Sequence, residues 1–184
     1  MEDLLCIGIG ILGAALDKRI CEKCGKEKSR AISIDDIIKS IPKEMLEYWN
    51  EKELVREILG NACTSTDLDK VYDNSIYNES KSMREKTIIC KNCFDNSLRR
   101  LKDKFDDAYI NMNQVETYPA TYKKAINLDT SVKPKIDTYY MYGGKWNTIN
   151  IMKFWAWYNG YDTIYNMTFN YDGKKITGVF AKRK

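Results

Sequence analysis

The sequence contains two Cys-x-x-Cys pairs and no histidine, and this combination limits the possible folds more than any other feature. Two thiolates three positions apart can bind one tetrahedral ion from a single turn, and two such turns complete the shell that structural zinc prefers. Four sulfurs leave no open position for a water nucleophile, so the metal is expected to support the fold and not to catalyse a reaction. The predicted ligands of this structural Zn²⁺ are Cys21, Cys24, Cys90 and Cys93.

Redox dithiols and disulfides are the two alternatives for these cysteines. A redox pair is expected in a thioredoxin-like strand-to-helix setting, which the sequence around Cys21 lacks. Disulfides need an oxidising compartment, and no secretory signal is visible, so a cytoplasmic protein is expected. Cys6 and Cys63 stand alone and are expected to be small buried hydrophobic residues, with Cys63 as a less favoured substitute ligand.

The residues around each pair favour the metal site. Cys24 is followed by Gly25 and Lys26, the Cys-x-x-Cys-Gly-Lys form of a zinc knuckle, in which glycine lets the chain turn under the ion. The second pair precedes N-cap residue types and helical spacing of apolar residues over 94–112, which places it at a helix start. In these two segments the chain resembles treble-clef and zinc-ribbon zinc fingers. The stretch between Cys24 and Cys90 is far longer than the usual spacer, so a large insertion is expected to loop out of the site.

The insertion between the two pairs is expected to be mainly helical. Ser33 begins a capping-type motif, Pro42 suits the first turn of the next helix, and helical spacing then continues to Gly60, which together predict an αα-hairpin. Residues 64–86 are polar, and one short helix within 68–77 is expected there.

An apolar run over residues 4–16 opens the chain. A helix of that length reaches only about 20 Å against roughly 30 Å of bilayer hydrocarbon, so no stable membrane span is expected. Gly8, Gly10 and Gly13 match a dinucleotide-binding fingerprint, but the second strand of a βαβ unit does not follow, and no cofactor binding is expected. The glycines are better explained by close helix packing, or by a protein or membrane contact.

The C-terminal part is expected to contain a small sheet. Segments 136–142, 161–169 and 175–180 have strand-like patterns around the turn signal Asp172-Gly173. Segment 147–158 fits a helix that ends at Asn-Gly better than an unusually long strand, although the strand stays open. This β-α-β-β order resembles a small bacterial domain of unknown function.

The predicted fold class is α+β. It combines a helix-rich, zinc-stapled N-terminal domain, with a treble-clef-like site of four cysteines, and a small C-terminal β-α-β-β antiparallel sheet unit. The expected segments are an apolar helix at 1–16, the zinc-stapled domain at 17–112, a linker at 113–134 and the aromatic-rich unit at 135–184.

Aromatic residues are concentrated in the C-terminal unit, with ten Trp, Tyr and Phe residues between 139 and 165. A small domain cannot bury all of these rings, so an aromatic face beside basic residues is expected to contact a partner. At least one of the three tryptophans should be accessible whether 147–158 is helix or strand. The candidate partner-binding residues are Trp146, Trp155, Trp157, Lys182 and Arg183.

The sequence indicates a protein that is not an enzyme. It lacks the commonest general base, histidine, and no P-loop or nucleophile elbow is present. The expected function is a zinc-stabilised protein–protein interaction module with another protein as its partner, and the composition suits a host-directed regulator or phage anti-defence inhibitor. The alternative is a nucleic-acid-binding regulator that uses the zinc knuckle and a basic aromatic face, which the net charge of +4 permits without demanding it.

Overall fold

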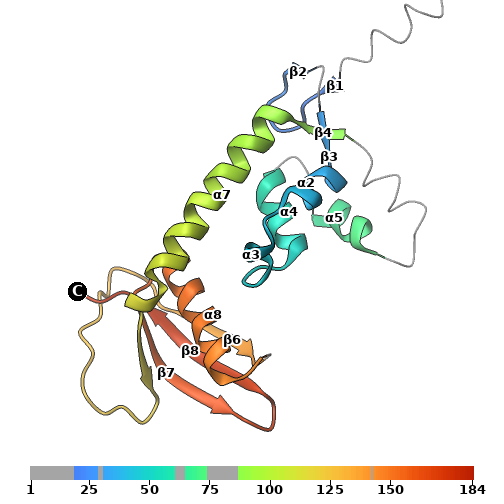
Figure 1. Cartoon of the computed structure of the whole chain (residues 1–184). Coiled ribbons are helices and arrows are strands. Elements are labelled where there is room, and N and C mark those ends of the chain that lie inside the picture. The colour runs from blue at the N-terminus through green and yellow to red at the C-terminus, as the bar shows by residue number, and fades with distance from the viewer. Residues whose placement is uncertain (1–18, 29–30, 61–64, 74–86, 142) are drawn as a thin grey trace, which may run out of the picture. The chain divides into compact units, whose positions relative to one another are not determined.

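The computed structural model describes residues 19–28, 31–60, 65–73, 87–141 and 143–184. The chain divides into two compact units, Met1–Leu101 (unit 1) and Lys102–Lys184 (unit 2), and each is described by itself (Figure 1). The division falls inside one long helix, α7 (Lys91–Asn111), so the first turns of α7 belong to unit 1 and its last turns to unit 2.

Two short antiparallel ladders organise the cysteine-bearing segments of unit 1. Strand β1 (Arg19–Ile20) pairs with β2 (Glu27–Lys28), and the turn between them contains the first cysteine pair. Strand β3 (Ala31–Ser33) pairs with β4 (Thr87–Cys90), with Ala31 opposite Cys90. The second ladder therefore joins two parts of the chain that are far apart in sequence.

In the described part of unit 1, short helices lie between β3 and β4 in the sequence: α2 (Ile34–Ser40), α3 (Lys43–Leu46), α4 (Glu51–Leu59) and α5 (Ser65–Tyr72). The predicted start at Ser33 is confirmed, because its hydroxyl accepts from the Asp36 backbone N–H while the Asp36 carboxylate accepts from the Ser33 N–H. The expected single helix up to Gly60 is two helices, since the Asn50 side chain caps a new start at α4 by accepting from the Lys52 N–H.

The helices of unit 1 share one apolar core. Helices this short gain little from intrinsic propensity and are stabilised by packing. Side chains from α2, α4 and α5 provide the completely or almost completely buried members: Ile34, Ile37, Leu54, Val55, Ile58, Leu59, Leu68 and Val71.

Unit 2 contains a four-stranded sheet with the order β5-β7-β8-β6. Its strands are β5 (Glu116–Pro119), β6 (Lys135–Tyr140), β7 (Thr163–Asn170) and β8 (Lys175–Ala181). A 3-10 turn, η3 (Met112–Gln114), leads from α7 into β5. The β6–β8 and β7–β8 pairs are antiparallel, whereas β5 is parallel to β7.

Helix α8 (Lys145–Tyr158) covers one face of this sheet, as Figure 1 shows for β6 and β8. Its buried Ile149, Met152 and Ala156 pack with Ile164, Met167, Ile176 and Phe180 of the strands. Gly178 in β8 lies directly beneath the helix, where an added Cβ would meet Ile164 Cγ2 at 2.6 Å and Met152 Cε at 3.2 Å. The close approach of helix and sheet therefore depends on a residue without a side chain.

The predicted mixture of helix and sheet is confirmed, and so is the helix at 147–158. The domain boundaries differ from those expected. The segment expected as a linker, 113–134, contains β5, which is part of the unit 2 sheet. A short strand that ends in proline and pairs in parallel with a distant strand carries no hairpin signal, which explains the difference.

Several sequence expectations fall outside the described residues, namely those for the apolar run at 4–16, the Gly8–Gly13 motif, Cys6 and Cys63. Within the described ranges, none of the helices combines the length and the apolar character that crossing a membrane would require.

Candidate metal centre

Four cysteine side chains converge in unit 1. The sulfur atoms of Cys21, Cys24, Cys90 and Cys93 all lie within 4.8 Å of one another, and the Cys24 and Cys90 sulfurs are 4.0 Å apart. All four are free thiols, since a disulfide would bring two sulfurs to about 2.05 Å. The two pairs that the sequence singled out are thus brought together and could hold one metal ion.

The first pair lies in the turn of the β1–β2 hairpin. The Gly25 N–H donates to the Cys21 carbonyl over 2.8 Å, and the Cys21 N–H donates to the Lys26 carbonyl over 3.0 Å. Gly25 has a φ of 66°, in the left-handed region where a side chain would add strain. The expected role of this glycine in the knuckle turn agrees with that geometry.

The second pair lies where a strand changes into a helix. Cys90 is the last residue of β4, and Cys93 lies in the first turn of α7. The Cys90 N–H donates to the Cys21 sulfur over 3.2 Å, so the two arms contact each other directly.

Cys21 and Cys93 differ in acidity. Burial would raise the pKa of the Cys21 thiol, but backbone N–H groups that donate to its sulfur, first that of Cys90, lower the pKa to about 6. Burial raises the pKa of the Cys93 thiol to about 12, and its contacts with the other three cysteines add to the increase. Cys21 is therefore the natural first thiolate of the cluster, and a bound cation would favour ionisation of the others.

Lys23, between the first two cysteines, links the knuckle to two helices. Its ammonium group donates to the carbonyl oxygen of Ile58 in α4 over 2.6 Å and to Ser97 Oγ in α7 over 2.8 Å. A cation at this position also opposes the charge of nearby thiolates. Nothing in the sequence pattern indicated this role, because its partners Ile58 and Ser97 lie 35 and 74 positions away in the sequence.

The donor set fits zinc. Tetrahedral Zn²⁺ with Zn–S bonds near 2.3 Å places its sulfurs about 3.8 Å apart, close to the spacing of these four thiols. Thiolate ligands select zinc, copper(I) or iron over the hard cations magnesium and calcium. Cys21 and Cys90 are buried, Cys93 is half-buried and Cys24 is exposed, so the cluster lies at the surface of unit 1 with two ligands inside.

The three candidate tryptophans of unit 2 differ in exposure. Trp146, in the first turn of α8, is 74% exposed, in agreement with the expectation that at least one is accessible. Trp155 and Trp157 are half-buried against the core. Trp155 makes edge contacts with Phe154 and Tyr158, and the Trp157 indole N–H donates to the Asp107 carboxylate over 2.8 Å.

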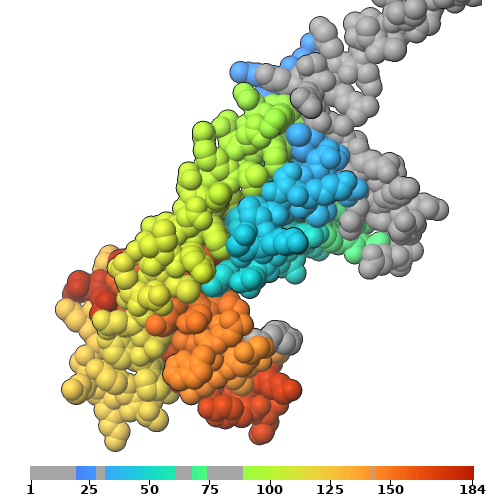
Figure 2. Space-filling view, viewed as in Figure 1, coloured from blue at the N-terminus to red at the C-terminus, as the bar shows by residue number. Residues whose placement is uncertain are grey.

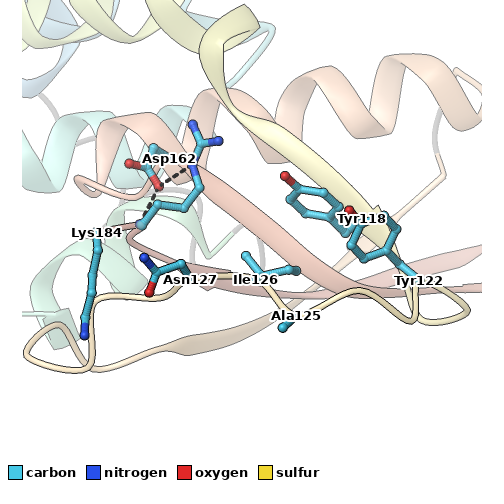
Figure 3. Close-up of a pocket in the computed structure, with 8 residues that line it drawn as sticks. Tyr118, Tyr122, Ala125, Ile126, Asn127, Asp162 and Lys184 are labelled. Atoms are coloured by element: carbon cyan, nitrogen blue, oxygen red, sulfur yellow. Dashed lines mark hydrogen bonds and ion pairs between the residues drawn. The ribbon is translucent and has the colours of Figure 1, made fainter.

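The two basic candidates are engaged in ion pairs. Lys182 lies 3.4 Å from Asp162, and the Arg183 guanidinium lies 2.5 Å from the Glu116 carboxylate. Arg183 helps to line a pocket of about 320 Å³, together with Tyr118, Tyr122, Ala125, Ile126, Asn127, Asp162 and Lys184. Figure 3 shows the two tyrosines on one side of this pocket and Asp162 on the other.

Trp146 belongs to a larger surface, here called the aromatic–lysine end. It comprises Tyr140, Lys145, Trp146, Phe169, Tyr171, Lys174 and Lys175, around the start of α8 and the β7–β8 turn. Figure 2 shows the start of α8 in orange and the β7–β8 hairpin in red at the surface of unit 2. Tyr171 lies outside the aromatic cluster noted in the sequence, and the predicted hairpin turn was the signal that could have placed it here.

The candidate metal centre is assigned from the geometry and the chemistry of the four cysteines and their surroundings. The knuckle turn, the strand-to-helix pair and the spacing of the sulfurs are the features that support it. Comparisons of the chain with protein families, curated proteins and solved structures find no match.

Proposed function

We propose that the protein is a non-enzymatic interaction module, in which one structural Zn²⁺ stabilises unit 1 and unit 2 docks on another macromolecule. The observation that carries the proposal is the convergence of four thiols to within 4.8 Å, although Cys24 and Cys90 are 66 positions apart in the sequence. With four thiolates as ligands the metal has no open position for substrate or water, so its role is structural.

A treble-clef-like arrangement is the form of zinc site that we propose. It is supported by a knuckle in a short hairpin and by a second ligand pair at the junction of β4 and α7. The paired strands are very short, and ladders of this size cannot hold the two arms together alone. Structural zinc contributes roughly 10 kcal/mol or more to small metal-dependent folds, enough to compensate.

The proposed docking unit is unit 2, because it exposes large aromatic side chains. Trp146 is 74% exposed, and tryptophan and tyrosine are the commonest residues at binding hot spots. Another protein is the partner class that the sequence favours, with nucleic acid as the alternative. A host-directed regulator or phage anti-defence inhibitor stays a prediction from composition alone.

Zinc content of cysteine variants tests the proposal. The native protein and a Cys6→Ser control, which keeps both pairs, should each hold one zinc per chain by elemental analysis. Cys24→Ser and Cys93→Ser should hold less and should lose the structure of unit 1, measured by hydrogen exchange. Equal zinc in all four proteins, or none in the native protein, would refute a four-cysteine site.

A further inference from the structure

The aromatic–lysine end combines exposed rings with lysine ammonium groups placed on them. Trp146 is 74%, Tyr171 65% and Tyr140 52% exposed. The Lys145 ammonium lies 4.1 Å from the centre of the Phe169 ring and 5.7 Å from that of Trp146, and the Lys175 ammonium lies 4.8 Å from that of Tyr140. Lys145 therefore joins Phe169 to Trp146 on the face that α8 covers, and Tyr171 extends this group by stacking on Phe169. Lys175 and Tyr140 form a second cation–ring contact at the same end of the sheet, on its other face.

Backbone pairing holds these side chains in place. Tyr140 lies directly opposite Lys175, which lies opposite Asn170 at the end of β7. The Met141 N–H donates to the Lys174 carbonyl over 2.8 Å, which fixes the turn, and the Tyr171 ring stacks on Phe169 at 6.4 Å. The surface is thus pre-organised, so ordering it for a ligand would cost little.

Charge selects an anionic ligand. Unit 2 contains 13 Lys and Arg residues and 8 Asp and Glu residues, a net charge of +5, whereas the whole chain has +4. At the aromatic–lysine end, Lys145, Lys174 and Lys175 accompany one carboxylate in the connecting turn, Asp172. The local charge therefore complements a polyanion.

The position of the lysines distinguishes an acidic protein surface from a nucleic acid as the ligand. The buried centre of a protein interface is depleted in lysine, which is found at the rim. Here the ammonium groups of Lys145 and Lys175 lie over the rings themselves. Rings that can stack on bases, interleaved with cations that can neutralise phosphates, are the arrangement of surfaces that bind single strands. Duplex bases are already stacked and would not reach these rings.

We propose that the aromatic–lysine end binds single-stranded nucleic acid. Trp146 and Tyr171 stack on bases, and Lys145, Lys174 and Lys175 neutralise phosphates. This inference rests on the proposed function only in taking unit 2 as the docking unit, and it does not depend on the metal. For the aromatic–lysine end, single-stranded nucleic acid is therefore the proposed partner in place of another protein.

Binding of a fluorescein-labelled oligothymidylate of about 20 nucleotides to the full-length protein, followed by anisotropy, tests the proposal. Trp146→Ala should weaken binding about tenfold, since base–aromatic stacking contributes that much per base. Lys175→Gln should weaken it and reduce the slope of log affinity against log salt by about 0.7. Tyr122→Ala and Lys123→Gln, in the loop after β5 at the other edge of the sheet, are matched controls that should bind as the native protein does.

Other outcomes would overturn the proposal. The first is that the protein binds neither oligothymidylate nor oligouridylate at low salt. The second is that Trp146→Ala and the native protein bind the single strand equally well. The third is that the protein binds a duplex of the same length more tightly than the single strand. Circular dichroism and zinc content of the same samples separate this failure from failure of the proposed function. A folded, zinc-loaded protein that ignores single strands would contradict the inference alone, whereas zinc-free protein that binds them would contradict only the metal assignment.

Discussion

The ammonium group of Lys23 donates a hydrogen bond to the backbone carbonyl of Ile58 over 2.6 Å. Ile58 lies in the last turn of α4, where carbonyl groups lack partners within the helix and the helix dipole favours a cation. Lys23 also donates to Ser97 Oγ in α7 over 2.8 Å. The residue between Cys21 and Cys24 thereby connects the knuckle turn to the helical insertion.

Replacing Lys23 should lower the stability of unit 1 without changing its metal content. Lys23→Met keeps the length of the side chain and removes its charge and donors, so unit 1 should lose about 1–2 kcal/mol of stability. Zinc content should stay at the native level, because all four thiols remain. Urea unfolding followed by circular dichroism measures the loss. The control is Lys26→Met, because Lys26 lies in the same turn and is exposed as Lys23 is. Equal urea midpoints for the two variants would show that the Lys23 contacts add nothing.

Gly178 should not tolerate a side chain. An alanine Cβ would lie 2.6 Å from Ile164 Cγ2, so α8 or β7 must shift, at a cost of roughly 1–3 kcal/mol. Gly178→Ala should therefore lower the melting temperature of unit 2. In the control Gly173→Ala, the added Cβ meets only side-chain atoms of Asn170, the nearest at 3.2 Å. A melting temperature for Gly178→Ala at or above that of Gly173→Ala would contradict the packing described for α8.

Stability of unit 2 should fall in acid because of Asp162. Although burial would raise the pKa of this carboxyl, the N–H of Arg183, the hydroxyl of Thr163 and the charge of Lys182 hold it below the ordinary value of 3.8. A lowered folded pKa contributes stability that is complete above 3.8 and is lost as the pH falls through the folded value.

The variant Asp162→Asn should lose roughly 2 kcal/mol at neutral pH, the scale of hydrogen bonds to a charged group. It should also lose less additional stability than the native protein between neutral pH and pH 3. Urea titrations at both pH values measure this difference, with Asp172→Asn in the exposed β7–β8 turn as the control. Parallel acid losses in the native protein and Asp162→Asn would exclude Asp162 as the source.

Local signals in the sequence predicted much of the structure. Ser33 starts α2 through a capping box, Gly25 allows the knuckle turn, and the Asp172-Gly173 turn joins β7 to β8. Each of these features depends on interactions within a few residues, so a pattern in the sequence is enough to reveal it. The cysteine pairs are the exception, since their spacing indicated a contact between distant parts of the chain through the chemistry of zinc.

Features that depend on tertiary contacts could not be predicted. Strand β5 pairs with β7 although β6 and α8 lie between them in the sequence, and nothing near Glu116 indicates that partner. Asn50 interrupts the predicted helix by capping α4, although apolar spacing continues through it. The contact between Lys23 and Ile58 exists only after the knuckle and α4 have folded against each other. In each case an interaction outside the local pattern decides the structure.

Mass spectrometry of the intact native protein, paired with a melting curve before and after chelation, tests the central claim most directly. The account predicts one zinc per chain, bound with loss of thiol protons, and a chelated protein whose unit 1 unfolds while unit 2 keeps its transition. Metal-free native protein with a melting curve that chelator leaves unchanged would contradict the assignment of Cys21, Cys24, Cys90 and Cys93 to a structural metal centre.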